Sequence, residues 1–442
     1  MGTGDAGGDG AGPGQAAFEE PTQTLVKLEN PIRISDAPSS IQKKMPFAKK
    51  LQTHRPQSWS ALPSDLAGLV LRRLPSHADR VRFAAVCHHW CFSRQEHCLP
   101  PPLPWLAFPD GTLFGLPHGE GAKESFKLPS SANYCMSGGD WLVFSHNGTC
   151  FLMDPFSEVT LTLPNISSFC RVDEPAGIIN DRHVMDEYMV GLVLHRDTAI
   201  FLRKVIRCSE FLVSAIVDIP PLRTVAYCQP GSTSWLVSGL GSIASFIDMM
   251  FYEGMLYIID RSNNLLGINV GEDNDNGKLR VSRIERLLDG APCGFKYFRG
   301  CLSYFDSYLV ESHGALLLVR REIFYIRDND MIGATKPAVG IEFEVSQSDF
   351  QSRSWVKVSS VGDDQALFIS KGSSRFVDVS RYKLNGNCIY FLDDGSCDWF
   401  WKDAPSSCAV YDMRDGNCFF IPLPTVRSKD VKMLAAWLFP QS

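Results

Sequence analysis

From about Trp105 to the last residue, the sequence is a succession of short apolar runs separated by turn-forming residues. Such runs flank Asn147-Gly148, Glu253-Gly254 and Asp415-Gly416, and Asn-Gly or Asp-Gly pairs supply the positive φ angles that two-residue hairpin turns need. Helical periodicity is hard to find in this span, since its nearest instance, Ile284 to Leu288, is short. The pattern therefore predicts a large all-β domain.

A single open sheet of this size would expose long unpaired edges, so a closed and repetitive β architecture is favoured. Two segments, Tyr252 to Asp260 and Leu384 to Asp393, share a turn glycine, a strand with tyrosine and a final aspartate, and we interpret both as hairpins. Blades of about 40 to 50 residues would divide the span into about six or seven. We therefore predict a β-propeller, with a large β-sandwich or two smaller β domains as the alternative.

Trp59 to Cys98 is the one stretch with helical character. Ser64 is an N-cap candidate, and a second helix is predicted from Val81 to Trp90. Apolar residues recur at three- and four-residue spacing in the first helix: Leu66, Leu69, Val70 and Leu74. A unit of about forty residues is marginal without a partner. The stretch therefore predicts an apolar surface that another molecule covers.

The same stretch holds the densest cluster of cysteine and histidine. Its members are Cys87, His88, His89, Cys91, His97 and Cys98. Structural zinc sites use two well-separated ligand pairs, whereas these residues are expected on one continuous helical segment. We therefore predict no metal site and no cofactor.

Residues 1–57 are rich in glycine and proline and poor in aromatic residues, which predicts a disordered tail. The helical domain then spans 58–98, a proline-rich linker 99–104 and the β domain 105–442. The tail contains a loose basic cluster that is either an import signal or a solvated charge run. The members of this cluster are Lys43, Lys44, Lys49, Lys50 and Arg55.

Charge and hydropathy narrow the range of partners. A net charge of -6 provides no broad basic field, so nucleic acid is not expected as a partner. A membrane is not expected either, because no run approaches the roughly 18 consecutive apolar residues of a spanning helix. The N-terminus lacks the apolar core of a secretory signal, so the fourteen cysteines are expected to be reduced thiols in the nucleus or cytoplasm.

Motifs of catalysis are weak or missing. Gly239 to Ala244 fits the G-x-G-x-x-A pattern, but Phe246 to Phe251 follows as a strand-like run, so no βαβ unit frames it. The acidic loop Gly271 to Gly277 lacks the bidentate glutamate of an EF-hand, because Ile284 occupies its position. We find no G-x-S-x-G, H-E-x-x-H or Walker motif and predict no catalytic residue.

The helical stretch resembles a known family, the F-box. The residues that carry the resemblance are Leu62-Pro63, Asp65-Leu66, Leu69-Val70, Leu74-Pro75, Asp79, Phe83, Val86-Cys87 and Trp90. The resemblance implies binding to the Skp-type adaptor of cullin-based ubiquitin ligases. It implies an adaptor-binding set of Leu62, Pro63, Leu66, Leu69, Val70, Leu74, Val86 and Trp90. Within this set, Val86 and Trp90 are expected to hold the helices together.

Residues 59–442 resemble the plant F-box proteins with a KIB-type β-propeller. The resemblance rests on Pro101 to Pro104, Asn387 to Phe391, Ala409 to Asp412 and Trp437 to Pro440. It implies a non-catalytic ligase subunit whose β domain binds a target protein.

Trp399, Phe400 and Trp401 are the candidate target-binding residues, with buried blade packing as the alternative. Two other functions stay open at this point. One is a β-propeller enzyme or carbohydrate-binding protein with a degenerate F-box, and the other is an adaptor-bound protein without a role in degradation.

Overall fold

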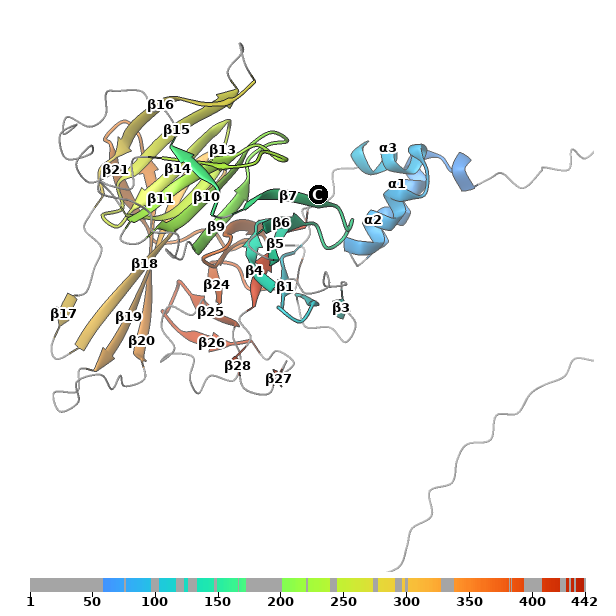
Figure 1. The fold of residues 1–442 in the computed structure, drawn as a ribbon. Coiled ribbons are helices and arrows are strands. Elements are labelled where there is room, and N and C mark those ends of the chain that lie inside the picture. Colours follow the sequence, from blue (N-terminus) through green and yellow to red (C-terminus); the bar gives the residue numbers. More distant parts are fainter. Residues whose placement is uncertain are drawn as a thin grey trace, which may run out of the picture. The chain divides into compact units, whose positions relative to one another are not determined.

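The computed structural model of the chain describes part of the unit Gln57–Ser442. The described residues are 59–74, 77–96, 103–116, 123–125, 133–146, 149–165, 167–171, 201–219, 222–238, 245–272, 277–290, 296–298, 301–326, 338–380, 382, 384–392, 408–421, 427–428, 431–432 and 435–440. The predicted tail 1–57 and most of the linker 99–104 lie outside these residues. The helices precede residue 97 and the strands follow residue 104 (Figure 1). Within the described residues, no helix has the length and hydropathy to span a membrane.

Six β-sheets form the blades of a β-propeller. In hydrogen-bonded order, blade 1 consists of β29 (Ala436–Leu438), β1 (Trp105–Ala107), β2 (Thr112–Gly115) and β3 (Lys123–Ser125). Blade 2 consists of β4 (Asn133–Gly138), β5 (Trp141–His146), β6 (Thr149–Met153) and β7 (Thr160–Asn165). Blade 3 consists of β8 (Phe169–Arg171), β12 (Trp235–Val237), β11 (Leu222–Cys228), β10 (Val213–Ile219) and β9 (Phe201–Arg207).

The remaining three blades follow in chain order. Blade 4 consists of β13 (Phe246–Tyr252), β14 (Met255–Asp260), β15 (Leu265–Glu272) and β16 (Leu279–Leu288). Blade 5 consists of β17 (Lys296–Phe298), β18 (Cys301–Ser312), β19 (Ala315–Ile326), β20 (Ala338–Asp349) and β21 (Ser354–Val358). Blade 6 consists of β23 (Arg375–Asp378), β22 (Gln365–Ile369), β24 (Cys388–Leu392), β25 (Cys408–Asp412) and β26 (Cys418–Phe420). A separate two-strand ladder joins β27 (Arg427–Ser428) and β28 (Val431–Lys432). The predicted propeller is confirmed, with six blades.

Each blade contributes one inner strand to the ring. These strands are β29, β4, β9, β13, β18 and β23, and each contacts the next in this order. The inner strands thus link consecutive blades, while the other strands extend each blade outward.

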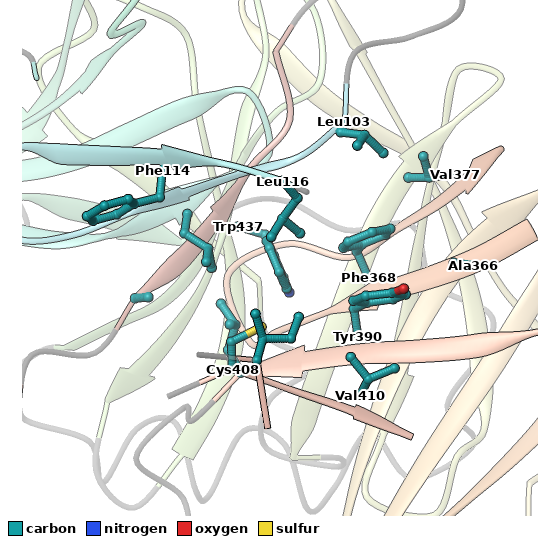
Figure 2. Packing of buried hydrophobic residues seen from close by; sticks show 14 of the residues in the cluster. Leu103, Phe114, Leu116, Ala366, Phe368, Val377, Tyr390, Cys408, Val410 and Trp437 are labelled. Carbon is teal, nitrogen blue, oxygen red and sulfur yellow. The ribbon is translucent and has the colours of Figure 1, made fainter. Parts of the chain in front are cut away.

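The ring closes through the last described strand. Strand β29 pairs antiparallel with β1, placing Trp437 opposite Leu106. Trp437 is fully buried, and its indole Nε1 donates to the carbonyl of Ile369 in blade 6 at 3.1 Å. Figure 2 shows this indole among Leu116 of blade 1 and the rings of Phe368 and Tyr390 of blade 6. Blades 1 and 6 therefore share one hydrophobic cluster.

Hairpin turns follow the predicted chemistry in blade 4. Strands β13 and β14 pair antiparallel with Tyr252 opposite Met255, which leaves Glu253 and Gly254 as a two-residue turn. Both turn residues have positive φ, 47° and 80°. This combination is that of a type I′ turn, whose twist matches the twist of the flanking strands. The hairpin prediction is confirmed here.

One local prediction in the β domain is wrong, and the one short helical pattern noted there is a strand, in line with the predicted all-β domain. Ile284 to Leu288, the best helical pattern, belongs to strand β16. The segment Leu384 to Asp393 is not a hairpin, because β24 pairs parallel with β22 and antiparallel with β25. Gly386 serves a close approach instead, since a Cβ there would lie 1.8 Å from the carbonyl oxygen of Asp363.

The nine cysteines whose side chains the structure describes are free thiols. Cys150, Cys228, Cys388 and Cys408 are buried among apolar side chains, while Cys170 is exposed. Burial raises the pKa of Cys388 to about 11, and it raises the pKa of Cys408 as well. The reactive thiolate form of the buried groups is therefore scarce at neutral pH.

This difference in burial predicts a difference in alkylation. At pH 8 we expect iodoacetamide to modify Cys170 at least about 100-fold faster than Cys408, because Cys408 is both shielded and protonated. Peptide mass spectrometry over a time course measures both rates, and the urea-unfolded chain is the control in which the two should converge. Equal rates in the native protein would contradict the buried placement of Cys408.

Candidate partner-binding surface

The helical unit consists of a short 3-10 helix and three α-helices. These are η1 (Trp59–Ala61), α1 (Ser64–Arg73), α2 (His77–Ala85) and α3 (His88–Glu96). The single second helix predicted from the sequence is wrong, because the chain breaks at Val86 and Cys87. The N–H of Val86 donates to Phe83 O at 3.2 Å, which ends α2 in a tightened turn. The carbonyl of Cys87 then accepts the first α-type bond of α3, from Cys91.

A small core holds the three helices together. Ala67, Leu71 and Phe83 are its buried residues. The Trp90 ring stacks on that of Phe83, with centroids 4.4 Å apart and planes inclined by 25°. Leu62, Leu74 and Trp90 pack around this core and are partly buried. The core thus fixes the orientation of α1 from one side.

Helix α3 anchors the start of α1. His89 Nε2 lies 2.6 Å from the carbonyl oxygen of Leu62, which can only accept, so Nε2 carries the proton. Trp90 Nε1 donates to the carbonyl of Trp59 at 3.1 Å. Ser64 is not the N-cap as predicted but the first helical residue, and its hydroxyl donates to Glu96 Oε2 at 2.6 Å. These bonds hold the Leu62-Pro63 corner against α3.

The opposite face of α1 is apolar and exposed. Leu66, Leu69 and Val70 are 48%, 47% and 40% exposed. The 3.6-residue period of α1 separates this face from the buried Ala67 and Leu71. Twelve large apolar side chains are exposed among the described residues, and six of them lie in the helical unit. The helical unit itself contains only a small part of the described residues. This concentration is typical of a surface that another protein covers.

The predicted adaptor-binding set therefore divides into two groups. Pro63, Leu66, Leu69 and Val70 are exposed, whereas Leu62, Leu74 and Trp90 pack on the helical core. Trp90 holds the helices together as expected, but Val86 does not, because it is 58% exposed in the break between α2 and α3. Whether these residues contact an adaptor stays a prediction.

Sequence reasoning missed two exposed aromatic residues, Trp59 and Phe92, which are 76% and 56% exposed. Phe92 directly follows Trp90 and Cys91 in α3, whose sequence is HHWCFSRQE, so its exposure could not be distinguished there from the burial of its apolar neighbours. Trp59 carries no signal of its own, because it precedes the first α-helix and has no periodic neighbours.

Two members of the cysteine and histidine cluster have structural roles. His89 binds the Leu62 carbonyl, and Cys87 caps α3. Across the described ranges, no three metal-ligating side chains converge. His97 and Cys98 lie outside these ranges, as do the candidate target-binding residues Trp399, Phe400 and Trp401. The G-x-G-x-x-A segment is also outside them, and the run that follows it is strand β13.

The chain is similar in sequence to plant proteins with F-box in their names and to a β-propeller family. The F-box protein At5g25290 of Arabidopsis thaliana is 24% identical over 363 residues, which cover 75% of this chain and 86% of that protein. A second A. thaliana protein with F-box in its name, At5g38270, is 21% identical and covers 80% of this chain and 88% of its own length. Among solved structures, the β-propeller domain of Cps50 (Swd1) from Myceliophteria thermophila aligns with a TM-score of 0.28 and 10% identity, over 74% of this chain and 90% of that one. The family model described as KIB1-4 beta-propeller matches residues 113–412. The chain therefore belongs to the KIB1-4 β-propeller family.

Proposed function

We propose that this chain is the substrate-recognition subunit of a cullin-based E3 ubiquitin ligase. Its helical unit binds a Skp-type adaptor, and through it a cullin, while its propeller binds a target protein. The chain itself is non-catalytic and acts in the nucleus or cytoplasm. Ubiquitin transfer is promoted because target and charged conjugating enzyme are held in one complex at high effective concentration.

The observation that carries this proposal is the exposed apolar face of α1, formed by Leu66, Leu69 and Val70. Full burial of such a side chain contributes about 1.5 to 3 kcal/mol, and roughly half of each remains available for a partner. The three side chains could thus add about 2 to 4 kcal/mol to an interface. The names of the A. thaliana relatives, which are F-box proteins, support the same assignment.

An acidic side chain on this face should abolish adaptor binding. We expect Val70→Asp to weaken binding to a purified Skp-type adaptor by about 100-fold or more, because a carboxylate would be buried without a partner. Biolayer interferometry with immobilised adaptor measures the change in Kd. Val70 suits this test better than Leu62, because Leu62 packs on the helical core and its loss would disturb the fold.

The matched control is Val159→Asp. Val159 is 54% exposed near β7, so the same change in chemistry is made at an exposed position of the propeller. The control should bind the adaptor as wild type does, and both variants should retain wild-type far-UV circular dichroism. Failure of the wild-type chain to bind, or equal binding by the two variants, would refute the ligase assignment.

A further inference from the structure

Two buried charges lie between adjacent blades of the propeller. Lys204 is in β9 of blade 3 and Asp248 is in β13 of blade 4. Lys204 Nζ is 2.5 Å from Asp248 Oδ1, and the two side chains are 5% and 3% exposed. The second oxygen, Asp248 Oδ2, accepts the N–H of Leu309 in β18 of blade 5 at 2.7 Å. One carboxylate thus joins the inner strands of three consecutive blades.

Both charged residues lie beside an irregularity in their strand. In β9, Lys204 pairs with Ile216 and Leu202 with Val217, so that Arg203 is an extra residue. In β13, Phe246 pairs with Asp260 and Asp248 with Ile259, so that Ile247 is an extra residue. A β-bulge of this kind re-aims the neighbouring side chain. The bulges explain how side chains of two separate sheets come to meet.

Burial of this ion pair is not explained by stability alone. Removing two charges from water costs several kcal/mol per ion, and apolar residues of similar volume often stabilise a protein as well or better. Desolvation raises the pKa of Asp248, while Lys204 and the Leu309 N–H act to lower it. The surrounding interface is apolar, with Ile216, Phe246 and Met249 in one cluster. A charged contact here provides direction and spacing that apolar contacts do not.

Several other contacts between blades do not pair two buried charges. Indole N–H groups donate to backbone carbonyls, from Trp235 to Pro164 between blades 3 and 2 and from Trp355 to Asn263 between blades 5 and 4. Lys371 and Asp306 approach at 3.9 Å between blades 6 and 5, but the lysine is 39% exposed. Within the described part of the ring, Lys204 and Asp248 form the only ion pair between blades with both charges buried.

We propose that Lys204, Asp248 and the N–H of Leu309 form an inter-blade clamp that fixes the spacing of blades 3, 4 and 5. In this arrangement Asp248 satisfies an N–H on the inner strand of blade 5, and Lys204 compensates the buried carboxylate. Loss of Lys204 leaves an unpaired charge between the blades, so the inner strands of blades 3, 4 and 5 separate from one another more readily, while the strands of blade 6 are unaffected. The clamp does not depend on the proposed ligase function.

A pair of variants tests the clamp. We expect Lys204→Met to lower the Tm of the full chain by about 5 °C or more, because the Asp248 carboxylate is left buried and unpaired. The double variant Lys204→Met/Asp248→Asn should regain at least about half of this loss, since it buries no charge and keeps an oxygen for the Leu309 N–H. Lys357→Met is the control, because its exposed ion pair with Glu344 should change Tm by about 1 °C or less.

Amide hydrogen exchange shows which blades are destabilised in Lys204→Met. In Lys204→Met, amides of β9, β13 and β18 should exchange at least about tenfold faster, while those of β24 and β25 keep wild-type rates. The clamp is refuted if Lys204→Met behaves like Lys357→Met, if exchange rises equally in all blades, or if the double variant is no more stable than the single one. Should Lys204→Met not fold, a folded double variant supports the clamp, and failure of both overturns it.

Discussion

Replacing Trp437 by alanine is expected to lower the free energy of unfolding by about 3 to 5 kcal/mol, the usual cost of removing a large buried aromatic side chain. The indole is fully buried where blades 1 and 6 meet, and its ring packs edge-to-face on Phe368 with centroids 5.1 Å apart. The variant also leaves the Ile369 carbonyl without its indole donor. Because β29 closes the ring, the loss falls on the contact that joins the two ends of the propeller.

Urea unfolding followed by tryptophan fluorescence and circular dichroism measures this loss as a shift of the midpoint at unchanged slope. Trp437→Phe should lower the free energy of unfolding by less than Trp437→Ala does, because phenylalanine keeps most of the ring contacts and removes mainly the N–H donor. Phe419→Ala is the matched control, since Phe419 is 45% exposed and its loss should cost about 0.5 kcal/mol or less. A Trp437→Ala midpoint equal to that of the control would mean that β29 does not close the ring.

The sequence predicted features whose cause is local. The Glu253-Gly254 turn was found because positive φ at two successive residues is a local requirement that glycine and a few other residues meet. The exposed face of α1 was predicted because the apolar residues that form it recur with the helical period within a single ten-residue helix. The propeller was found because many such local signals recur over the span and imply a closed ring.

Features that depend on distant segments could not be predicted from local patterns. Ile284 and Leu288 are buried four residues apart in β16, a spacing that also fits a helix. Register shifts against β15 alter the simple alternation of the strand, so periodicity alone could not identify it. Lys204 and Asp248 carry no sequence signal at all, because they meet only once two blades pack side by side.

Val86 and Ser64 were misplaced for a related reason. Ser64 was assigned as a cap because serine favours that position before an apolar helical run, and Val86 was assigned from one continuous second helix and from the resemblance to the F-box. Ser64 bonds to Glu96 instead of capping its own helix, and Val86 lies in the break after α2. Helix boundaries are the positions that a sequence pattern specifies least well.

Gly386 shows how one sequence signal can have two physical causes, and it yields the second large prediction. Gly386→Ala is expected to cost about 3 kcal/mol or more, because its Cβ would lie 1.8 Å from Asp363 O and 2.4 Å from Asp363 C. The neighbouring backbone cannot shift freely, since Arg414 donates to both the Gly386 carbonyl and the Asp363 carboxylate. The N–H of Asn387 is also held, by Gly362 O at 2.9 Å.

Two glycine controls separate steric overlap from backbone conformation. Gly271→Ala should be neutral or stabilising by up to about 1 kcal/mol, because a Cβ there meets no atom within 4 Å and its φ is not positive. Gly254→Ala should cost about 1 to 2 kcal/mol, because its surroundings are open but its φ is 80°. The urea midpoint should thus be highest for Gly271→Ala, lower for Gly254→Ala and lowest for Gly386→Ala. If Gly386→Ala were as stable as Gly254→Ala, the glycine at 386 would be a turn residue after all, and the close approach of β24 to the Asp363 backbone would be wrong.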